Sequence, residues 1–470
     1  MSRLIVVSNR VQTPNQISES PGGLSIGILG ALKAQGGVWY GWSGEVRSDA
    51  CREKNRLNQD GVEYITMDLT PQEYADYYVG FSNRLLWPLC HYVLGFVHYD
   101  RGEYEGYRQV NRLFAENLLA SLQPDDLIWV HDYHLIPIAH ELRKLGVQNR
   151  IGFFLHVPFP CYEMLRSLPI AKQLLGFLSE YNVVGVQTDD DLKSYQDATV
   201  RGLGGRQASK YHLTINERTV YADSFPIGVD ISGAGTPTSN ALADDMPGLV
   251  SNGKAKLLVG VDRIDYSKGL TQRLKAFHQF LKCNPDQHRL VSMMQIATVS
   301  RGTDPDYVGL RIEIEKQISR INGEYADIGW LPIHYLNRSI SHRRLMQVFQ
   351  HADICIVTSL RDGMNLVSKE FVCAQNEDDP GVLILSELAG SSKQLDAALL
   401  INPYDMNAIA DAIRQAVNMT KAERIERYKS MIEAVMTYDI HKWRDSFILA
   451  LHQQPSSSLT ISNPDCVFAG

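Results

Sequence analysis

The chain has 470 residues, 44% of them hydrophobic and 21% charged, which is ordinary for a globular protein that buries a sizeable core. Its formal net charge of −7 gives no indication of a nucleic-acid partner. No apolar run reaches the roughly 18 residues of a membrane span, and Leu4–Val7 is too short for a signal peptide, so we expect a cytoplasmic protein without a membrane partner. The 7 cysteines are scattered and never spaced C-x-x-C, which predicts neither a disulfide framework nor a cysteine zinc site.

Short apolar runs alternate with longer helical patterns along most of the chain. In the first half we predict strands at Leu4–Ser8, Leu127–His131, Ile151–His156, Val183–Gln187 and Tyr221–Pro226. In the second half the predicted strands are Lys256–Val261, Leu290–Ile296, Ile354–Thr358, Val382–Ser386 and Leu399–Ile401. Helical periods lie between them, for example at Leu270–Lys282, Tyr307–Ile321 and Met406–Val417. Solid hydrophobic strands alternating with helices indicate an α/β protein with doubly wound parallel sheets.

A change in composition divides the chain near its middle. Residues 229–252 are rich in Gly, Ser, Pro and Asp, which is typical of a linker that runs into a surface loop. We therefore predict one Rossmann-like domain at residues 1–235 and a second at 236–451, facing each other across a cleft. The tail 452–470 has little helical signal, and either packs back on the first domain or stays loose. Ligands of such sheets bind at the carboxyl ends of the strands, so candidate site residues are sought there.

The first candidate site follows the first strand. Arg10 ends the strand, and a polar loop then leads to Pro21, Gly22 and Gly23 at the start of a helical pattern. Backbone amides at a helix N-terminus and a nearby arginine suit a phosphate group. A surface loop whose glycines serve only its turns is an equally good interpretation. The G-x-G-x-x-G fingerprint is absent, which gives a nicotinamide or flavin cofactor little support.

The second candidate site is the segment VDRIDYSKGL at residues 261–270. Arg263 follows a strand, and Lys268 comes five residues later where a helix begins. Two cations at that position could neutralise negative charge that develops on a leaving diphosphate. The alternative is a pair of solvated surface cations, but Asp265 and Gly269 in the same turn favour the functional interpretation.

The third candidate site, TSLRDGMNLVSKEF at residues 358–371, carries the most information. An apolar strand stops before a turn that contains Asp362, and a helix is predicted to start near Leu366, which leaves the amides of Leu366 and Val367 free to donate. Asp362 and Glu370 would lie about 12 Å apart if the segment is mostly helical. That span suits one carboxylate on a sugar and the other on a ribose. The alternative is that Asp362 only caps the helix and that Glu370 is a surface charge.

Histidines and an aspartate cluster at two further strand ends, in HDYH at residues 131–134 and in LHVPFP at 155–160. His131, Asp132, His134 and His156 lack the spacing of a metal site, so we predict no metal. His156 is the best candidate for donating a hydrogen bond to a sugar hydroxyl. His131 and His134 are interpreted as structural. The DPDYV segment that begins at Asp304 resembles a phosphatase nucleophile motif only superficially, and we predict a helix N-cap there.

These motifs together resemble the trehalose-6-phosphate synthase family, in its short bacterial form, over nearly the whole chain. The matching segments are, in order, VVSNR, GGLSIGILGALK, WYGWSGE, FSNRLLWP, WVHDYHLIP, RIGFFLHVPFP, DRIDYSKGL, TVSRG, RINGEYADIGW, LRDGMNLVSKEF and INPYD. The resemblance implies a GT-B architecture and a retaining glucosyl transfer from UDP-glucose to glucose 6-phosphate without metal or cofactor. It also implies a homo-oligomer, either a tetramer or a dimer.

The resemblance also implies a role for individual residues. Those that would bind the donor are Gly23, His156, Arg263, Lys268, Asp362, Leu366, Val367 and Glu370. Those that would bind the acceptor are Arg10, Tyr78, Trp87, Asp132 and Arg301. The catalytic set would be Arg263, Lys268, His156 and Asp362. No carboxylate pair stands ready as nucleophile and acid, so we expect front-face transfer in which the leaving phosphate takes the acceptor proton. Lys268→Ala should then depress turnover more than binding.

Other functions remain to be weighed against this one. The nearest is the same donor chemistry with glycerol 3-phosphate as acceptor, and Arg10, Tyr78 and Trp87 together argue for the hexose phosphate instead. A non-catalytic sugar-phosphate-binding regulator should lack some of Arg263, Lys268, Asp362 and Glu370, whereas all are present. A dehydrogenase is a poor match because the glycine fingerprint of its cofactor site is absent. A nucleotide-sugar epimerase is also a poor match, because it would not need residues that bind an acceptor's phosphate. The nucleotide, UDP against GDP or ADP, is left open.

Overall fold

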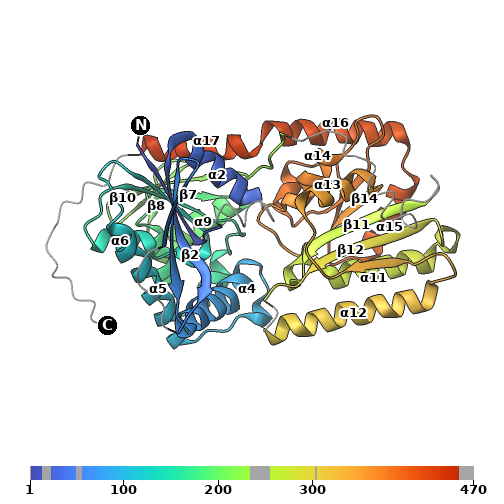
Figure 1. Cartoon of the computed structure of the whole chain (residues 1–470), viewed down its shortest axis with the longest axis horizontal. Coiled ribbons are helices and arrows are strands. Elements are labelled where there is room, and N and C mark those ends of the chain that lie inside the picture. The colour runs from blue at the N-terminus through green and yellow to red at the C-terminus, as the bar shows by residue number, and fades with distance from the viewer. Residues whose placement is uncertain (1, 13–22, 49–54, 233–254, 302–303, 455–470) are drawn as a thin grey trace.

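Two α/β units lie side by side along the long axis of the molecule (Figure 1). The computed structural model describes residues 2–12, 23–48, 55–232, 255–301 and 304–454. The linker predicted at 229–252 and the tail at 452–470 fall mostly outside the described residues. Each unit has one sheet with helices on both faces, the arrangement expected for Rossmann-like domains.

The first unit is built on a ten-stranded sheet with the order β3-β4-β2-β1-β5-β6-β7-β10-β9-β8. Its central strands are parallel, and the antiparallel pairs β3–β4, β10–β9 and β8–β9 lie toward its two edges. The strands are β1 (Leu4–Arg10), β2 (Gly37–Val46), β3 (Asn55–Gln59), β4 (Val62–Leu69), β5 (Leu127–His131), β6 (Arg150–Phe154), β7 (Val183–Val186), β8 (Arg206–Gln207), β9 (His212–Ile215) and β10 (Arg218–Ser224).

Helices flank both faces of this sheet. They are α2 (Gly23–Gln35), α3 (Pro71–Glu73), the π-helix η1 (Tyr74–Leu86), α4 (Trp87–Cys90), η2 (Leu94–Phe96), α5 (Arg101–Leu119), η3 (Tyr133–Leu135), α6 (Ile138–Lys144), α7 (Tyr162–Leu165), α8 (Ala171–Leu178) and α9 (Asp189–Leu203). Among the described helices of the whole chain, none is both long and apolar enough to cross a bilayer.

The second unit has a six-stranded, all-parallel sheet with the order β13-β12-β11-β14-β15-β16. Its strands are β11 (Lys256–Arg263), β12 (Val291–Thr298), β13 (Ile333–Leu336), β14 (Ile354–Val357), β15 (Val382–Ser386) and β16 (Leu399–Ile401). Its helices are η4 (Tyr266–Lys268), α11 (Leu270–Cys283), η5 (Pro285–Gln287), α12 (Pro305–Tyr325), α13 (His342–His351), α14 (Leu366–Ala374), η6 (Gly390–Lys393), α15 (Met406–Asn418) and α16 (Lys421–Thr437). Separate apolar clusters fill the two faces of the sheet.

All ten predicted strands are present, with ends that differ by no more than a few residues. Of the strands in the described residues, the prediction omitted six, and β2 and β4 are the most important of these because they extend the first sheet beyond β1. Glycines obscure β2, since they weaken the strand signal. The packing requires them: a Cβ atom on Gly37 would lie 2.1 Å from the carbonyl oxygen of Leu4, and one on Gly41 would lie 2.1 Å from that of Ser8.

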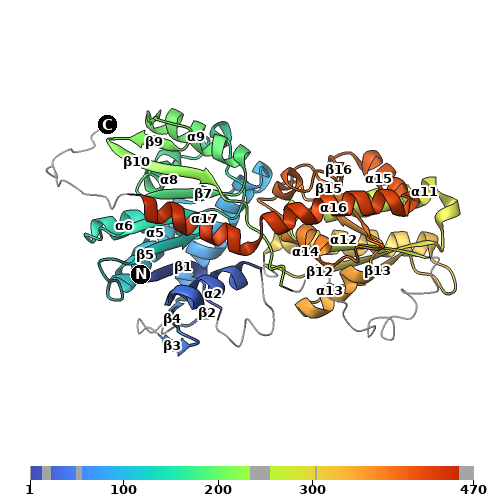
Figure 2. The same cartoon turned by 90° about the horizontal axis from the view of Figure 1, so that it is seen from above.

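The chain crosses between the two units twice, and the two crossings touch. Residues after β10 lead out of the first unit, and helix α17 (Ile440–Gln453) returns to it after α16 (Figure 2). The amide of Ile440 donates to the carbonyl of Val229 at 3.1 Å. A Cβ atom on Gly228 would lie 2.2 Å from the carbonyl oxygen of Tyr438, so only glycine allows this approach. From α14, the buried Lys369 ammonium donates to the carbonyl of Ile227 at 2.7 Å.

Helix α17 belongs to the core of the first unit. Its Phe447 stacks on Trp129 with ring centroids 4.7 Å apart, and Trp443 lies 5.0 Å from the same ring. Phe447 also occupies the space that a side chain would take at Gly152 and Gly185. The segment 440–451 therefore packs on the first unit, whereas the predicted boundary assigned it to the second. Sequence patterns show that a helix is amphipathic but not which sheet its apolar face will cover.

Candidate active site

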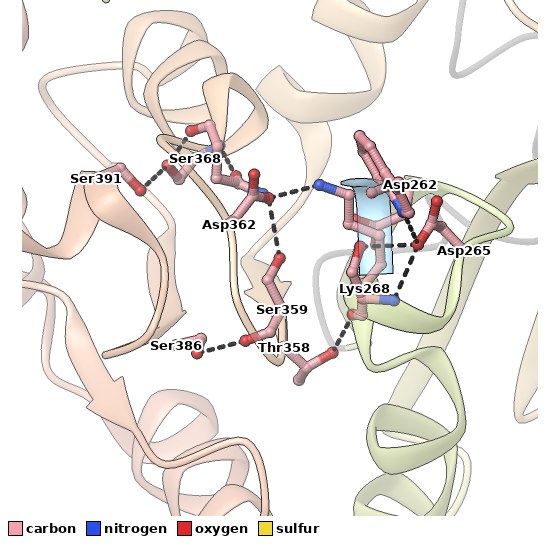
Figure 3. Close-up of polar contacts among 12 residues, drawn as sticks. Asp262, Asp265, Lys268, Thr358, Ser359, Asp362, Ser368, Ser386 and Ser391 are labelled. Atoms are coloured by element: carbon pink, nitrogen blue, oxygen red, sulfur yellow. Dashed lines mark hydrogen bonds and ion pairs between the residues drawn. The ribbon is translucent and has the colours of Figure 1, made fainter. Parts of the chain in front are cut away.

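A lysine and an aspartate from neighbouring strand ends form the centre of the candidate site (Figure 3). The Lys268 ammonium donates to Oδ2 of Asp362 at 2.6 Å, and both side chains are mostly buried, with 14% and 13% of their surface exposed. Asp362 also accepts hydrogen bonds from the hydroxyl of Ser359 at 3.2 Å and from the side-chain amide of Asn365 at 3.1 Å. The structure thus brings together two residues that are 94 positions apart in the sequence.

Local sequence explains the position of Lys268. Strand β11 ends at Arg263, and the short helix η4 ends at Lys268. Gly269 follows with φ 64°, and a Cβ atom there would lie 2.0 Å from the carbonyl oxygen of Thr358. Only glycine combines this backbone conformation with so close an approach. The Lys268 turn is therefore pressed against the end of β14, which carries the Asp362 loop.

Asp362 does not cap the helix that follows it, so the alternative interpretation of this residue is wrong. The N-cap of α14 is Asn365, whose side-chain oxygen accepts from the Ser368 amide at 3.0 Å. Burial by itself would raise the pKa of Asp362, but the ion pair with Lys268 and the Asn365 hydrogen bond bring it below its ordinary value. Asp362 is therefore a charged carboxylate held in place by its neighbours.

The remaining predicted donor residues lie close by on α14 and β11. The helix begins at Leu366, as predicted, and Leu366 and Val367 form its first turn, where amides lack partners within the helix. Glu370 lies one turn further along, and its carboxylate is 3.7 Å from the His342 ring, which raises the pKa of that histidine. Arg263 is exposed at the end of β11. Gly23 is the first residue of α2, and the loop before it lies outside the described residues.

Aromatic and cationic groups meet where the two units touch. Trp87 of α4 lies beneath two guanidinium groups of the second unit, with Arg301 at 4.4 Å and Arg263 at 5.6 Å from the ring centroid. The indole N–H of Trp87 donates to Oδ1 of Asp265 at 3.4 Å. Arg301 has a left-handed backbone with φ 51°, follows β12, and donates to the hydroxyl of Tyr307. These contacts join α4 of the first unit to the carboxyl ends of β11 and β12 in the second.

A histidine pair and a loop of the second unit meet at the end of β6. The imidazoles of His131 and His156 are 3.1 Å apart, from Nδ1 to Nε2, and burial lowers the pKa of His156 to about 3. Both rings are therefore neutral at neutral pH, and one must donate while the other accepts. Gly363 approaches so closely that a Cβ atom on it would lie 2.2 Å from the carbonyl oxygen of His156.

The other predicted acceptor residues surround this region. Tyr78 of η1 stacks on His134 with ring centroids 5.8 Å apart. Burial, and after it the charge of Arg301, lower the pKa of His134 to about 3. Arg10 is exposed at the end of β1, and its guanidinium lies against Gly44.

Three residues of this centre were absent from the predicted site. Ser359 and Asn365 hold Asp362, and Asp265 joins Trp87 to the Lys268 turn. Asp265 lies in the second candidate segment, where its place beside Gly269 was noted, and Ser359 and Asn365 lie in the third, but none of them was assigned a role. His131 was interpreted as structural, and the structure places its ring against His156. Among the described residues, no group of three or more His, Cys, Asp or Glu side chains could hold a metal ion.

Asp132 is strained and electrostatically unusual. It has φ 76°, follows β5, and its Oδ1 accepts from the His156 amide at 3.2 Å. Burial raises the pKa of its carboxyl to about 7. Because the folded protein holds this proton more tightly than the unfolded chain, Asp132 contributes stability at low pH that is lost between about pH 4 and pH 7.

Asp132→Asn should remove this pH dependence, and asparagine has nearly the same size and shape as the aspartate that already holds this backbone conformation. We expect the variant to gain stability relative to the parent protein as pH rises from 5 to 7, by about 1–2 kcal/mol after allowing for screening at a partly exposed side chain. The difference should then level off. Thermal unfolding at pH 5, 6, 7 and 8 measures it, and a difference that does not change with pH would contradict the raised pKa.

Two Rossmann-like domains that meet at such a site have the GT-B architecture of glycosyltransferases that use nucleotide sugars. The chain belongs to glycosyltransferase family 20, whose family model matches residues 2–453. A trehalose-6-phosphate synthase of Cronobacter sakazakii is 43% identical over 458 residues, which cover 96% of this chain and 96% of that protein.

Solved structures agree with the sequence relationship. A structure from Escherichia coli, bound with UDP-2-fluoro glucose, has a TM-score of 0.92 and 41% identity, and the match covers 97% of this chain and 100% of that one. A UDP-forming trehalose-phosphate synthase from Burkholderia xenovorans, in complex with glucose-6-phosphate, has a TM-score of 0.91 and 39% identity, over 96% of this chain and 100% of that one. The predicted family and the predicted GT-B fold are confirmed.

Proposed function

We propose that this protein transfers glucose from UDP-glucose to glucose 6-phosphate and releases UDP and α,α-trehalose 6-phosphate. The observation that carries the proposal is that two groups of residues meet at the domain boundary. We call them the donor half-site and the acceptor half-site. The second domain supplies the Lys268–Asp362 pair beside the N-terminus of α14, and the first supplies Trp87 under Arg301. The Escherichia coli and Burkholderia xenovorans relatives bind a UDP-sugar and glucose-6-phosphate respectively, which are the two substrates that these half-sites would hold.

The donor would lie against the second domain. Its diphosphate would face Lys268, Arg263 and the free amides of Leu366 and Val367, all of which are positive. The backbone of Gly23 would close over the same group. Glu370 would accept hydrogen bonds from the ribose hydroxyls. Asp362 and His156 would hold the glucose, with the carboxylate as acceptor and the neutral imidazole as donor.

The acceptor would lie between the first domain and Arg301 of the second. Its phosphate would meet Arg10, Tyr78 and Arg301, and its sugar ring would lie beside Trp87 and Asp132. Arg301 is mostly buried, with 12% of its side chain exposed, so a phosphate bound there would be shielded from water and held strongly. The phosphate of glycerol 3-phosphate would bind to the same residues, but its short carbon chain would leave much of the region beside Trp87 and Asp132 unfilled.

The chemistry follows from where charge develops. The bond between glucose C1 and the β-phosphate oxygen breaks, and the two bonding electrons leave with UDP. The acceptor's anomeric hydroxyl attacks C1 from the same face, and its proton passes to the departing phosphate oxygen. Lys268, Arg263 and the α14 amides stabilise the growing negative charge on UDP, which is the largest contribution expected in this site.

Incubating the protein with UDP-glucose and glucose 6-phosphate should yield UDP and trehalose 6-phosphate in equal amounts. GDP-glucose, ADP-glucose and glycerol 3-phosphate, each substituted in turn, test the donor base and the acceptor. Turnover with only another acceptor would overturn the substrate assignment. Binding of both ligands without any turnover would favour the alternative function of a non-catalytic regulator that binds sugar phosphates.

We also propose that the protein acts in the cytoplasm as a homo-oligomer. The family resemblance supports a tetramer or a dimer, and light scattering coupled to size-exclusion chromatography would distinguish them from a monomer.

A further inference from the structure

Asp265 is a buried carboxylate at the junction of the two half-sites. It lies between β11 and η4, and 1% of its side chain is exposed. Its Oδ1 accepts from the amide of Ser267 at 2.9 Å and from the hydroxyl of Ser267 at 2.8 Å. These bonds make Asp265 the N-cap of the turn that ends in Lys268 (Figure 3). One side of the carboxylate therefore shapes the donor half-site.

The same carboxylate also holds the acceptor half-site. The indole N–H of Trp87 donates to Oδ1 at 3.4 Å, and the hydroxyl of Tyr307, on α12, donates to Oδ2 at 3.1 Å. Arg301 lies 3.8 Å from Oδ2 and donates to the Tyr307 hydroxyl. Trp87 comes from the first domain, and the other groups come from the second.

Asp265 remains ionised despite its burial. Burial would raise its pKa, but the charges of Arg301 and Arg263 and the nearby His91 bring the pKa below its ordinary value. A charged carboxylate binds a guanidinium group and an indole N–H more strongly than a neutral group does. Arg301 has φ 51°, a conformation that a non-glycine residue keeps only when its surroundings hold it. Tyr307 and Asp265 stabilise this conformation through their contacts with the Arg301 guanidinium.

We propose that Asp265 is a positioning residue that couples the two half-sites: its ionised carboxylate orients Arg301 and Trp87 for the acceptor while it caps the turn that presents Lys268 to the donor. The inference rests on the proposed function, which assigns Trp87 and Arg301 to the acceptor. Asp265 itself lies beneath these residues with 1% of its side chain exposed, so we assign it no direct contact with either substrate.

Asparagine and alanine separate the two roles of Asp265. Asp265→Asn keeps a side-chain oxygen that can cap the Lys268 turn but loses the charge that holds Arg301. We expect its Kd for glucose 6-phosphate, measured calorimetrically in the presence of UDP, to rise about 10-fold or more, together with its acceptor KM. Its Kd for UDP should stay within about twofold. Asp265→Ala loses the cap as well, so UDP binding should weaken too.

Two further variants test whether the effects of the Asp265 substitutions come only from a general disturbance of the structure. Tyr307→Phe removes the hydroxyl that links Arg301 to Asp265 and leaves the cap untouched, so it should raise the acceptor Kd and spare UDP. Asp405→Asn changes another N-cap aspartate of the same domain, which is exposed and accepts from the Asn407 and Ala408 amides, and it should leave both affinities unchanged. Circular dichroism and melting temperature would confirm that each variant is folded.

The outcomes separate this inference from the proposed function. If the parent protein binds both ligands without turning them over, the proposed function fails while the affinities still test Asp265. If the parent protein converts the two substrates to product, an unchanged acceptor Kd in Asp265→Asn would overturn the inference. A parallel loss of UDP affinity in Asp265→Asn would overturn it as well, because the carboxylate would then be acting on the fold and not on the acceptor residues.

Discussion

Lys268→Ala should lower kcat by about 10²–10³-fold while raising the Kd for UDP only several-fold. The lysine faces the position where negative charge grows as the bond to glucose breaks, so its contribution is greater in the transition state than in the ground state. The substitution also leaves the Asp362 carboxylate without its 2.6 Å partner, so burial should then raise the pKa of Asp362. Steady-state kinetics and UDP calorimetry measure the two effects separately.

The chain offers a matched control for this experiment. Lys256, at the other end of β11, pairs with Asp353 at 2.7 Å, so Lys256→Ala removes a similar ion pair far from the site. Its side chain is more exposed, and we expect kcat to change less than twofold. Equal losses of kcat in the two variants would mean that the lysine acts through stability, and an unchanged kcat in Lys268→Ala would defeat the proposed mechanism.

Gly363→Ala should lower kcat/KM by about 100-fold or more. The added methyl carbon would lie 2.2 Å from the carbonyl oxygen of His156, so the Asp362 loop and the first domain would have to separate by about an ångström. A displacement of that size in a catalytic arrangement costs about two orders of magnitude. UDP binding, which depends on the second domain, should be affected much less.

Small-angle scattering should show the physical cause of the Gly363→Ala defect. With both ligands bound, the variant should keep a larger radius of gyration than the parent protein, because its domains cannot approach fully. Gly323→Ala, within α12, is the control, because its methyl group meets nothing within 4 Å. A normal kcat/KM in Gly363→Ala would show that the approach of this loop to His156 does not limit turnover.

The two chain segments that join the domains are held together by direct contacts. Both crossings run side by side, through the Ile440–Val229 hydrogen bond and the contact of Gly228 with Tyr438. Lys369, one residue before Glu370, is tied to the first crossing through the Ile227 carbonyl. The helix proposed to bind the donor is therefore connected directly to the chain segment that links the domains.

The sequence alone determined most of the fold. Strands such as Leu127–His131 and Val382–Ser386 are solid apolar runs between turn residues, so their position follows from local pattern. It also identified Lys268, Asp362 and His156 as candidates, because each follows a strand whose carboxyl end must lie at the ligand-binding edge. Local rules such as these need no knowledge of distant segments.

Only the tertiary structure decided which groups meet. The pairing of Lys268 with Asp362, the place of Asp265 under Trp87 and Arg301, and the return of α17 to the first sheet all join segments that are distant in the sequence. Strand β2 was missed because its glycines serve the close approach of β1, a requirement that appears only when the two strands are side by side. Such contacts depend on sheet order and on domain approach, and local propensity encodes neither.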